Sequence, residues 1–300
     1  MKNILKLVGL MLLPAVAMAQ SLVMVPQTKP VGGLVFQSTA NKNINALELD
    51  RQGFVRIRPG FGVRDDFNGR SIDSTKWFAT AGTNASVSIV VSDTGMVSMT
   101  FPASTTLSTS GAQLTSERNF KPSLGPISFE TRLIRSTSST GVVFAGLVDS
   151  TSLITPVGIS ATAGGLTGVS ATTTTSSTGN FVGMVFDSSA SWPPNISTSQ
   201  PFWRMAGNKD SISTTTPSTG ISASTVGSGL TFQTLRMNVD TSGNATFFID
   251  GRQVGSLTNA VSTTATLTPY VGGIARAGSA QFLNVDYLQA EQSLTATPRK

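Results

Sequence analysis

The stretch TLRMNVDTSGNATFFIDGRQVGSL, residues 234–257, decides the fold class. In LRMNVD, apolar residues alternate with polar ones, which is the pattern of a strand with one buried face. The run ATFFI follows a turn around Gly243, and Asp250-Gly251 is typical of a two-residue hairpin of type I′, because both residues tolerate positive φ. The stretch therefore predicts three successive antiparallel strands, and its aspartates are explained as turn residues.

Short strand-like runs continue along most of the chain, separated by Gly, Pro, Asp, Asn, Ser and Thr. They include VSIVV, MVSMTF, ISFETRLI, VVFAGLV, NFVGMVF, YVGGIA and FLNVDYL. No helical periodicity of useful length accompanies them. This texture predicts an all-β fold, a two-sheet antiparallel jelly-roll sandwich over residues 64–290. The low-complexity stretch 162–179 is either a mobile loop within one domain, which we favour, or a linker between two.

The two ends of the chain differ from the middle. Residues 1–19 have a basic start, an apolar core and an Ala-Met-Ala cleavage signal, which predicts a removable secretory signal peptide; an N-terminal anchor helix is the alternative. Residues 20–63 predict an extended N-terminal arm with short strands at ALELD and FVRIR, and residues 291–300 a flexible tail. We expect an exported protein, with no stable membrane insertion once the signal is removed.

Composition narrows the classes of partner. The chain has 300 residues, no cysteine and a net charge of +6, and only 12% of its residues are charged. Without cysteine it forms no disulfide. The basic residues are scattered and lack interleaved aromatic residues, which argues against a nucleic-acid partner. The charge suits solubility, with weak attraction to acidic glycans or cell surfaces.

Three segments resemble the concanavalin-like and laminin-G-like β-sandwich superfamily. They are RDDFNGRSIDSTKW (64–77), the stretch 234–257 and FLNVDYLQ (282–289). The resemblance implies the sandwich fold, in a superfamily of lectins, glycosidases and structural modules. More narrowly, FVGMVFDSSA, PFWRMAGNKD and the 234–257 region are similar to sandwich proteins among tailed-phage structural genes. That similarity implies a particle-surface or adhesion role, with coat proteins as partners and a virion location if the gene belongs to a phage.

Candidate catalytic residues are few. Without histidine there is no Ser-His-Asp triad and no histidine-ligated zinc. Laminarinase-type glucanases of this superfamily carry a Glu-x-Asp-x-x-Glu strand, whose alternation puts the carboxylates on one face about 5 Å apart. The glutamates here, Glu48, Glu117, Glu130 and Glu291, are far apart in sequence, although distant carboxylates can still converge in space. We therefore expect no enzyme activity, with glycoside hydrolysis as the disfavoured alternative.

Calcium is a candidate ligand, because many members of the superfamily bind it near their first and last strands. Asp65, Asp66 and Asp286 fall in those strands, which commonly pair in this fold. Calcium takes six to eight oxygen ligands, so Asn68 and backbone carbonyls would have to help. The alternative, which we favour, is that Asp66 caps a turn and Asp286 faces solvent.

Aromatic residues are the candidates for sugar binding. Trp192 and Asn195 lie in SWPPN, where two prolines suggest a loop that holds the ring outward, and Phe202 and Trp203 lie in PFWRM. For Trp203 a core position is the favoured alternative, and Trp77 is expected in the core. The sequence thus predicts a non-enzymatic exported surface, adhesion or structural protein, with a carbohydrate-binding lectin as the first alternative. It gives no oligomeric state.

Overall fold

The computed structural model of the chain describes residues 33–37, 44–49, 55–58, 60–90, 95–102, 111–116, 119–136, 141–149, 179–187, 202–213, 218–223, 232–275 and 280–294. The chain forms two units, a small one of Met1–Phe61 with Ala296–Lys300 and a large one of Gly62–Thr295. The described part contains one short 3-10 helix, η2 (Pro122–Leu124). None of its helices has the length and apolar character needed to cross a membrane.

The small unit contains a three-stranded antiparallel sheet. Its strands β1 (Gly33–Gln37), β2 (Ile44–Leu49) and β3 (Val55–Arg58) follow one another in sequence and in space. Two of them fall on ALELD and FVRIR, where short strands were expected, whereas β1 was not foreseen. In this sheet, residues 34, 47 and 57 occupy one row of the register.

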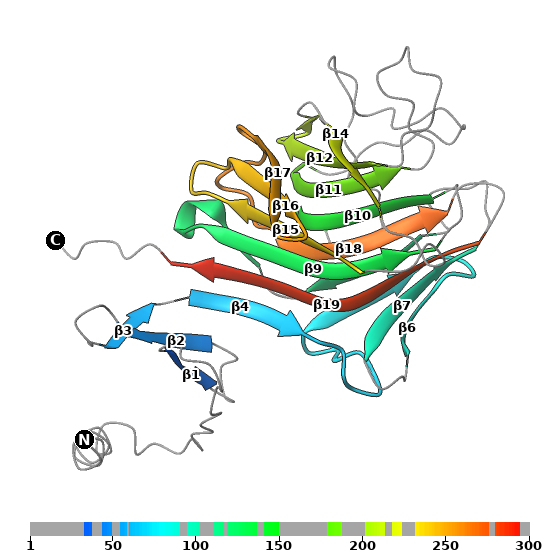
Figure 1. Cartoon of the computed structure of the whole chain (residues 1–300), viewed down its shortest axis with the longest axis horizontal. Helices are drawn as coiled ribbons and strands as arrows, with labels where there is room; N and C mark the ends of the chain where they lie inside the picture. The colour runs from blue at the N-terminus through cyan, green and yellow to red at the C-terminus, as the bar shows by residue number, and fades with distance from the viewer. Residues whose placement is uncertain are drawn as a thin grey trace. The chain divides into compact units, whose positions relative to one another are not determined.

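The large unit is built from two eight-stranded antiparallel sheets (Figure 1). The first sheet has the order β13-β12-β11-β10-β18-β8-β5, and β14 also pairs with β12. Its strands are β5 (Trp77–Ala81), β8 (Gly111–Ser116), β10 (Gly141–Val148), β11 (Phe181–Asp187), β12 (Phe202–Lys209), β13 (Ile212–Ser213), β14 (Ser218–Ser222) and β18 (Thr268–Ala275).

The second sheet has the order β17-β16-β15-β9-β19-β7-β6, and β4 also pairs with β19. Its strands are β4 (Gly60–Asp65), β6 (Ser86–Val90), β7 (Met96–Phe101), β9 (Ile127–Arg135), β15 (Gln233–Val239), β16 (Ala245–Ile249), β17 (Arg252–Leu257) and β19 (Gln281–Ser293). Figure 1 shows β19, coloured red, running between β9 and β7. The first and last strands of the sandwich pair as expected, and β19 extends three residues past the expected boundary at 290.

The stretch 234–257 forms the predicted three-stranded meander. β15 pairs with β16, and β16 pairs with β17 across the hairpin at Asp250-Gly251. The φ angles of Asp250 and Gly251 are +51° and +79°, as a type I′ turn requires. Asp250 also accepts a hydrogen bond from Thr234 N at 2.8 Å through its Oδ1. The aspartate is therefore a turn residue, as the sequence indicated.

The two sheets differ in how they are buried. Every residue of β8 and β10 is buried, so the first sheet is covered on both faces at these strands. In β9, β15, β16 and β19 buried residues largely alternate with more exposed ones, so one face of the second sheet meets solvent. The core lies between the sheets, where the buried Trp203 of β12 donates its indole N–H to Gln233 Oε1 of β15 at 2.9 Å.

Candidate functional site

Asp65 connects the first strand of the sandwich to Trp77. Its Oδ1 accepts a hydrogen bond from Phe67 N at 2.9 Å, and its Oδ2 accepts from Trp77 Nε1 at 3.0 Å and Lys76 Nζ at 3.5 Å. Phe67 has a φ of +51°, which is rare for a bulky residue, and its buried ring lies 6.0 Å from that of Trp77. Asp65 therefore stabilises the turn that places both rings in the core, where Trp77 was expected.

The other two candidate calcium ligands are also bound to neighbours. Asp66 pairs with Arg64 at 3.1 Å, and Asp286 pairs with Arg132 at 2.8 Å. Within the described residues, no group of three or more acidic, histidine or cysteine side chains could hold a metal ion. Asp65, Asp66 and Asp286 thus do not form the oxygen-rich set that calcium requires.

The four candidate sugar-binding residues have different environments. Trp203 is fully buried and belongs to the core, which was the favoured alternative for it, so its indole is not a stacking platform. Phe202, the first residue of β12, is half-buried. Trp192 and Asn195 lie outside the described residues. The described part of the chain therefore leaves Phe202 as the partly accessible member of this group.

The outer face of the first sheet combines an apolar cluster with buried polar side chains, among them Gln113, Thr115 and Arg204. Val143, Phe186 and Trp203 share a register row that faces the second sheet, because Trp203 binds Gln233 there. Residues one step along each strand therefore face away from the second sheet. They form a buried cluster of Val142, Phe144, Val148, Phe181, Val185, Ala206, Tyr270 and Ile274. At these positions the face carries aliphatic and aromatic side chains in place of carboxylates.

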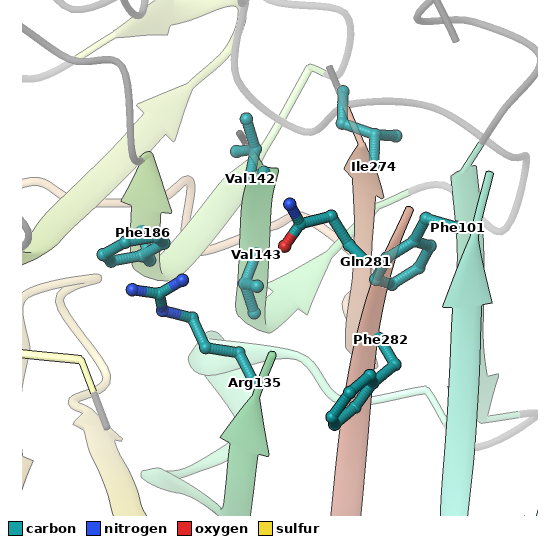
Figure 2. Close-up of a pocket in the computed structure, with 9 residues that line it drawn as sticks. Phe101, Arg135, Val142, Val143, Phe186, Ile274, Gln281 and Phe282 are labelled. Carbon is teal, nitrogen blue, oxygen red and sulfur yellow. The ribbon is translucent and has the colours of Figure 1, made fainter. Parts of the chain in front are cut away.

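A small cavity lies at one end of the sandwich, where β9 and β11 end and β10 and β19 begin. Figure 2 shows Arg135 and Gln281 beside it, with the Phe186 ring next to the guanidinium. The Arg135 Cζ lies 3.9 Å from the centre of that ring, and its Nη1 donates to Ser136 O at 3.1 Å. Burial lowers the pKa of Arg135 to about 10. The cavity of about 10 Å³ has room for roughly one water molecule, so it is too small for a sugar.

The outer face of the second sheet carries a polar and aromatic surface that the sequence analysis missed. Glu130 of β9 accepts a hydrogen bond from the Tyr287 hydroxyl of β19 at 2.6 Å. Burial, together with this hydrogen bond and the charge of Glu130, raises the pKa of Tyr287 to about 12. Arg132, on the same face, holds Asp286. The alternation in ISFETRLI placed Glu130 and Arg132 on one face, but their partners come from another strand more than 150 residues away.

Arg236 and Phe248 extend this surface onto β15 and β16. The guanidinium of Arg236 lies over the Phe248 ring, with its Cζ 4.2 Å from the ring centre. Arg236 and Glu130 are directly opposite one another in the register of β15 and β9. A cation, an aromatic ring and a carboxylate thus lie side by side on rigid strands, which is a surface able to bind polar ligands.

Comparison with known proteins identifies the class of fold. No protein-family model and no curated protein matches the chain. The carbohydrate recognition domain of Emp47p is similar in structure, with a TM-score of 0.50 at 12% identity over 78% of this chain and 95% of that chain. Peanut lectin has a TM-score of 0.51 at 13% identity over 79% and 99%. A Bacillus licheniformis β-glucanase has a TM-score of 0.47 at 9% identity over 76% and 97%.

These likenesses concern the fold. The structures with TM-scores of 0.50 and 0.51, together with the two antiparallel sheets, show that the large unit has a concanavalin-like β-sandwich fold, as the sequence predicted. Because the same fold carries unrelated functions, what the site does has to be argued from this chain's own residues.

Proposed function

We propose that this protein is a non-catalytic carbohydrate-recognition module of an exported surface or adhesion protein. The observation that carries the proposal is that most carboxylates of the described residues accept a hydrogen bond or form an ion pair. Glu130 is held by Tyr287, Asp286 by Arg132, and Asp65 by Phe67 and Trp77. Neighbouring amide groups likewise donate hydrogen bonds to four further carboxylates, those of Asp149, Asp210, Asp240 and Asp250.

Glycoside hydrolysis needs a different arrangement. Its two carboxyl groups flank the scissile bond, one giving a proton and the other acting as nucleophile or base. A carboxylate tied into a turn or an ion pair is poorly placed for either role. The hydrogen bonds and ion pairs that hold these carboxylates therefore favour binding over hydrolysis.

We propose that the loop between β11 and β12 supplies the main sugar contact. That loop carries Trp192 and Asn195 and leads directly into Phe202. An exposed aromatic ring gives a flat apolar surface, and an amide beside it hydrogen-bonds hydroxyl groups, which is a common way to fix a ligand's orientation. Export by the signal peptide at 1–19, and a role on a particle or cell surface, belong to this proposal.

A glycan array with the purified full chain tests the proposal. We expect at least one glycan whose binding Trp192→Ala abolishes and Phe78→Ala leaves intact, since Phe78 is an exposed ring on the edge strand β5, 46% accessible. Incubation with the bound glycans should release no reducing ends. Hydrolysis of a bound glycan, or an array without any binding, contradicts the proposal.

A further inference from the structure

The outer face of the second sheet contains a row of side chains that crosses five strands. Gln253 of β17, Phe248 of β16, Arg236 of β15, Glu130 of β9 and Gln289 of β19 are successive partners in the register. We name these five residues the cross-strand row. Adjacent strands lie about 4.8 Å apart, so the row spans roughly 19 Å.

The two charged members of the row do not bind each other. Opposite charges directly across a strand pair normally attract and stabilise a sheet. Within the described residues, however, the ion pairs of this face join other groups, such as Arg132 and Asp286, and none joins Arg236 to Glu130. Arg236 instead stacks on Phe248, and Glu130 accepts from Tyr287.

Each of these contacts leaves hydrogen-bonding capacity unused. A guanidinium has five N–H donors, and stacking on a ring uses none of them. A carboxylate has about four acceptor sites, and the Tyr287 hydroxyl fills one. The Nε of Arg236 is itself buried without a partner, so the stacked ring, and not a hydrogen bond, fixes the guanidinium. The face therefore presents the N–H donors of the Arg236 guanidinium and the acceptor oxygens of the Glu130 carboxylate, which do not bind each other.

We infer that the cross-strand row is a second glycan-binding surface, which takes a neutral polysaccharide chain. The inference rests on the proposed carbohydrate recognition but names a surface distinct from the β11–β12 loop. Vicinal hydroxyl groups accept from a guanidinium and donate to a carboxylate, so one diol can bridge the gap between Arg236 and Glu130. Gln289 and Gln253 extend the same chemistry to either end of the row.

Charge balance selects a neutral ligand. Arg236 and Glu130 cancel within the row, and Arg132 and Asp286 cancel beside it. An acidic polymer gains from Arg236 what it loses to Glu130, so the row offers its charge no net attraction and binds by hydrogen bonds that a neutral chain makes equally well. Because the row lies on strands, its groups are already in place before binding, which reduces the entropy lost on association.

Affinity electrophoresis of the full chain tests the inference, with laminarin and hydroxyethylcellulose as neutral probes and polygalacturonate as the acidic one. Glu130→Gln keeps an oxygen that accepts from Tyr287 but removes the negative charge, and Arg236→Gln removes the guanidinium donors. We expect each to weaken retardation by a neutral probe about tenfold, as the loss of a charge-assisted hydrogen bond does. Arg132→Gln, on the same face but already paired with Asp286, is the matched control and should change little.

The outcomes separate this inference from the proposed function. Binding to a neutral probe that survives Trp192→Ala but falls in Glu130→Gln and Arg236→Gln supports the second surface. If Trp192→Ala abolishes binding on the array and neither Glu130→Gln nor Arg236→Gln changes the retardation by any probe, the inference is wrong. The proposed function stands in that case. Retardation by polygalacturonate alone also overturns the inference, and an array without any bound glycan overturns both.

Discussion

Asp65 is the residue on which the start of the sandwich depends. It accepts hydrogen bonds from the Phe67 amide and the buried Trp77 indole. Asp65→Ala would leave that indole N–H buried without a partner. We predict a loss of about 2–3 kcal/mol in the free energy of unfolding, measured by urea denaturation.

Asp66 is the matched control for this prediction. It is adjacent in sequence, but its ion pair with Arg64 is exposed, with side-chain accessibilities of 48% and 54%. Exposed pairs contribute about 0–1 kcal/mol, so Asp66→Ala should be close to neutral. Equal losses in the two variants would contradict the role given to Asp65.

The two tyrosines predict how stability responds to alkaline pH. Burial raises the pKa of Tyr270, and burial with Glu130 raises the pKa of Tyr287 to about 12. Unfolded tyrosines titrate near pH 10. The folded state holds the phenol protons to a higher pH than the unfolded state does. The contribution of the two tyrosines to the free energy of unfolding is therefore complete below about pH 10 and is lost as pH rises toward their folded-state pKa values.

Absorbance at 295 nm measures this titration directly, because the chain has only 2 tyrosines. We expect the native protein to show no phenol ionisation near pH 10. Glu130→Gln should lower the midpoint of Tyr287 by removing the repulsive charge and leave Tyr270 unchanged. Ionisation of both tyrosines near pH 10 in the folded protein would be inconsistent with their environments.

At the scale of elements, two glycines of the meander allow the cost of backbone strain to be compared with the cost of steric overlap. Gly251 and Gly243 have nearly equal φ angles of +79° and +78°. A Cβ on Gly251 would meet nothing within 4 Å, whereas one on Gly243 would overlap the Val261 carbonyl oxygen. Gly251→Ala should cost about 1–2 kcal/mol from backbone conformation alone. Gly243→Ala should cost clearly more, and equal unfolding free energies would refute this difference.

Many strands were predicted from their residue patterns, and these patterns differ between the two sheets. The segments ISFETRLI and TLRMNV, in which apolar and polar residues alternate, lie in the second sheet, which has a solvent-facing side. The unbroken apolar runs VVFAGLV and FVGMVF lie in the middle of the first sheet, where the strands are buried on both faces. GAQLTS was missed as a strand because its polar Gln113 and Thr115 are buried, contrary to the usual exposure of such residues.

The site was less accessible to sequence reasoning than the fold. Glu130, Arg236 and Phe248 become neighbours only through the register of three strands, and that register depends on which strands pair. The stretch 234–257 predicted that β15 pairs with β16, but not that β9 pairs with β15. The pairing of Asp286 with Arg132 was missed for a related reason, since it also crosses strands.

For the whole molecule, the contacts of Asp65, Asp66 and Asp286 predict indifference to calcium. A ligand that binds the folded state raises its melting temperature. We expect scanning calorimetry to give the same melting temperature in excess calcium and in excess chelator. A rise of several degrees in calcium would reveal a site formed by other oxygen ligands.

The central position of β19 has a consequence for the order in which the sandwich is made. This strand, Gln281–Ser293, pairs with β9 on one side and with β7 and β4 on the other. A ribosome synthesises β4, β7 and β9 long before β19, so the growing chain holds three strands whose shared neighbour does not yet exist. The second sheet therefore closes only after residue 293 has been made. Until then the open edges of β7 and β9 are the natural targets for a chaperone.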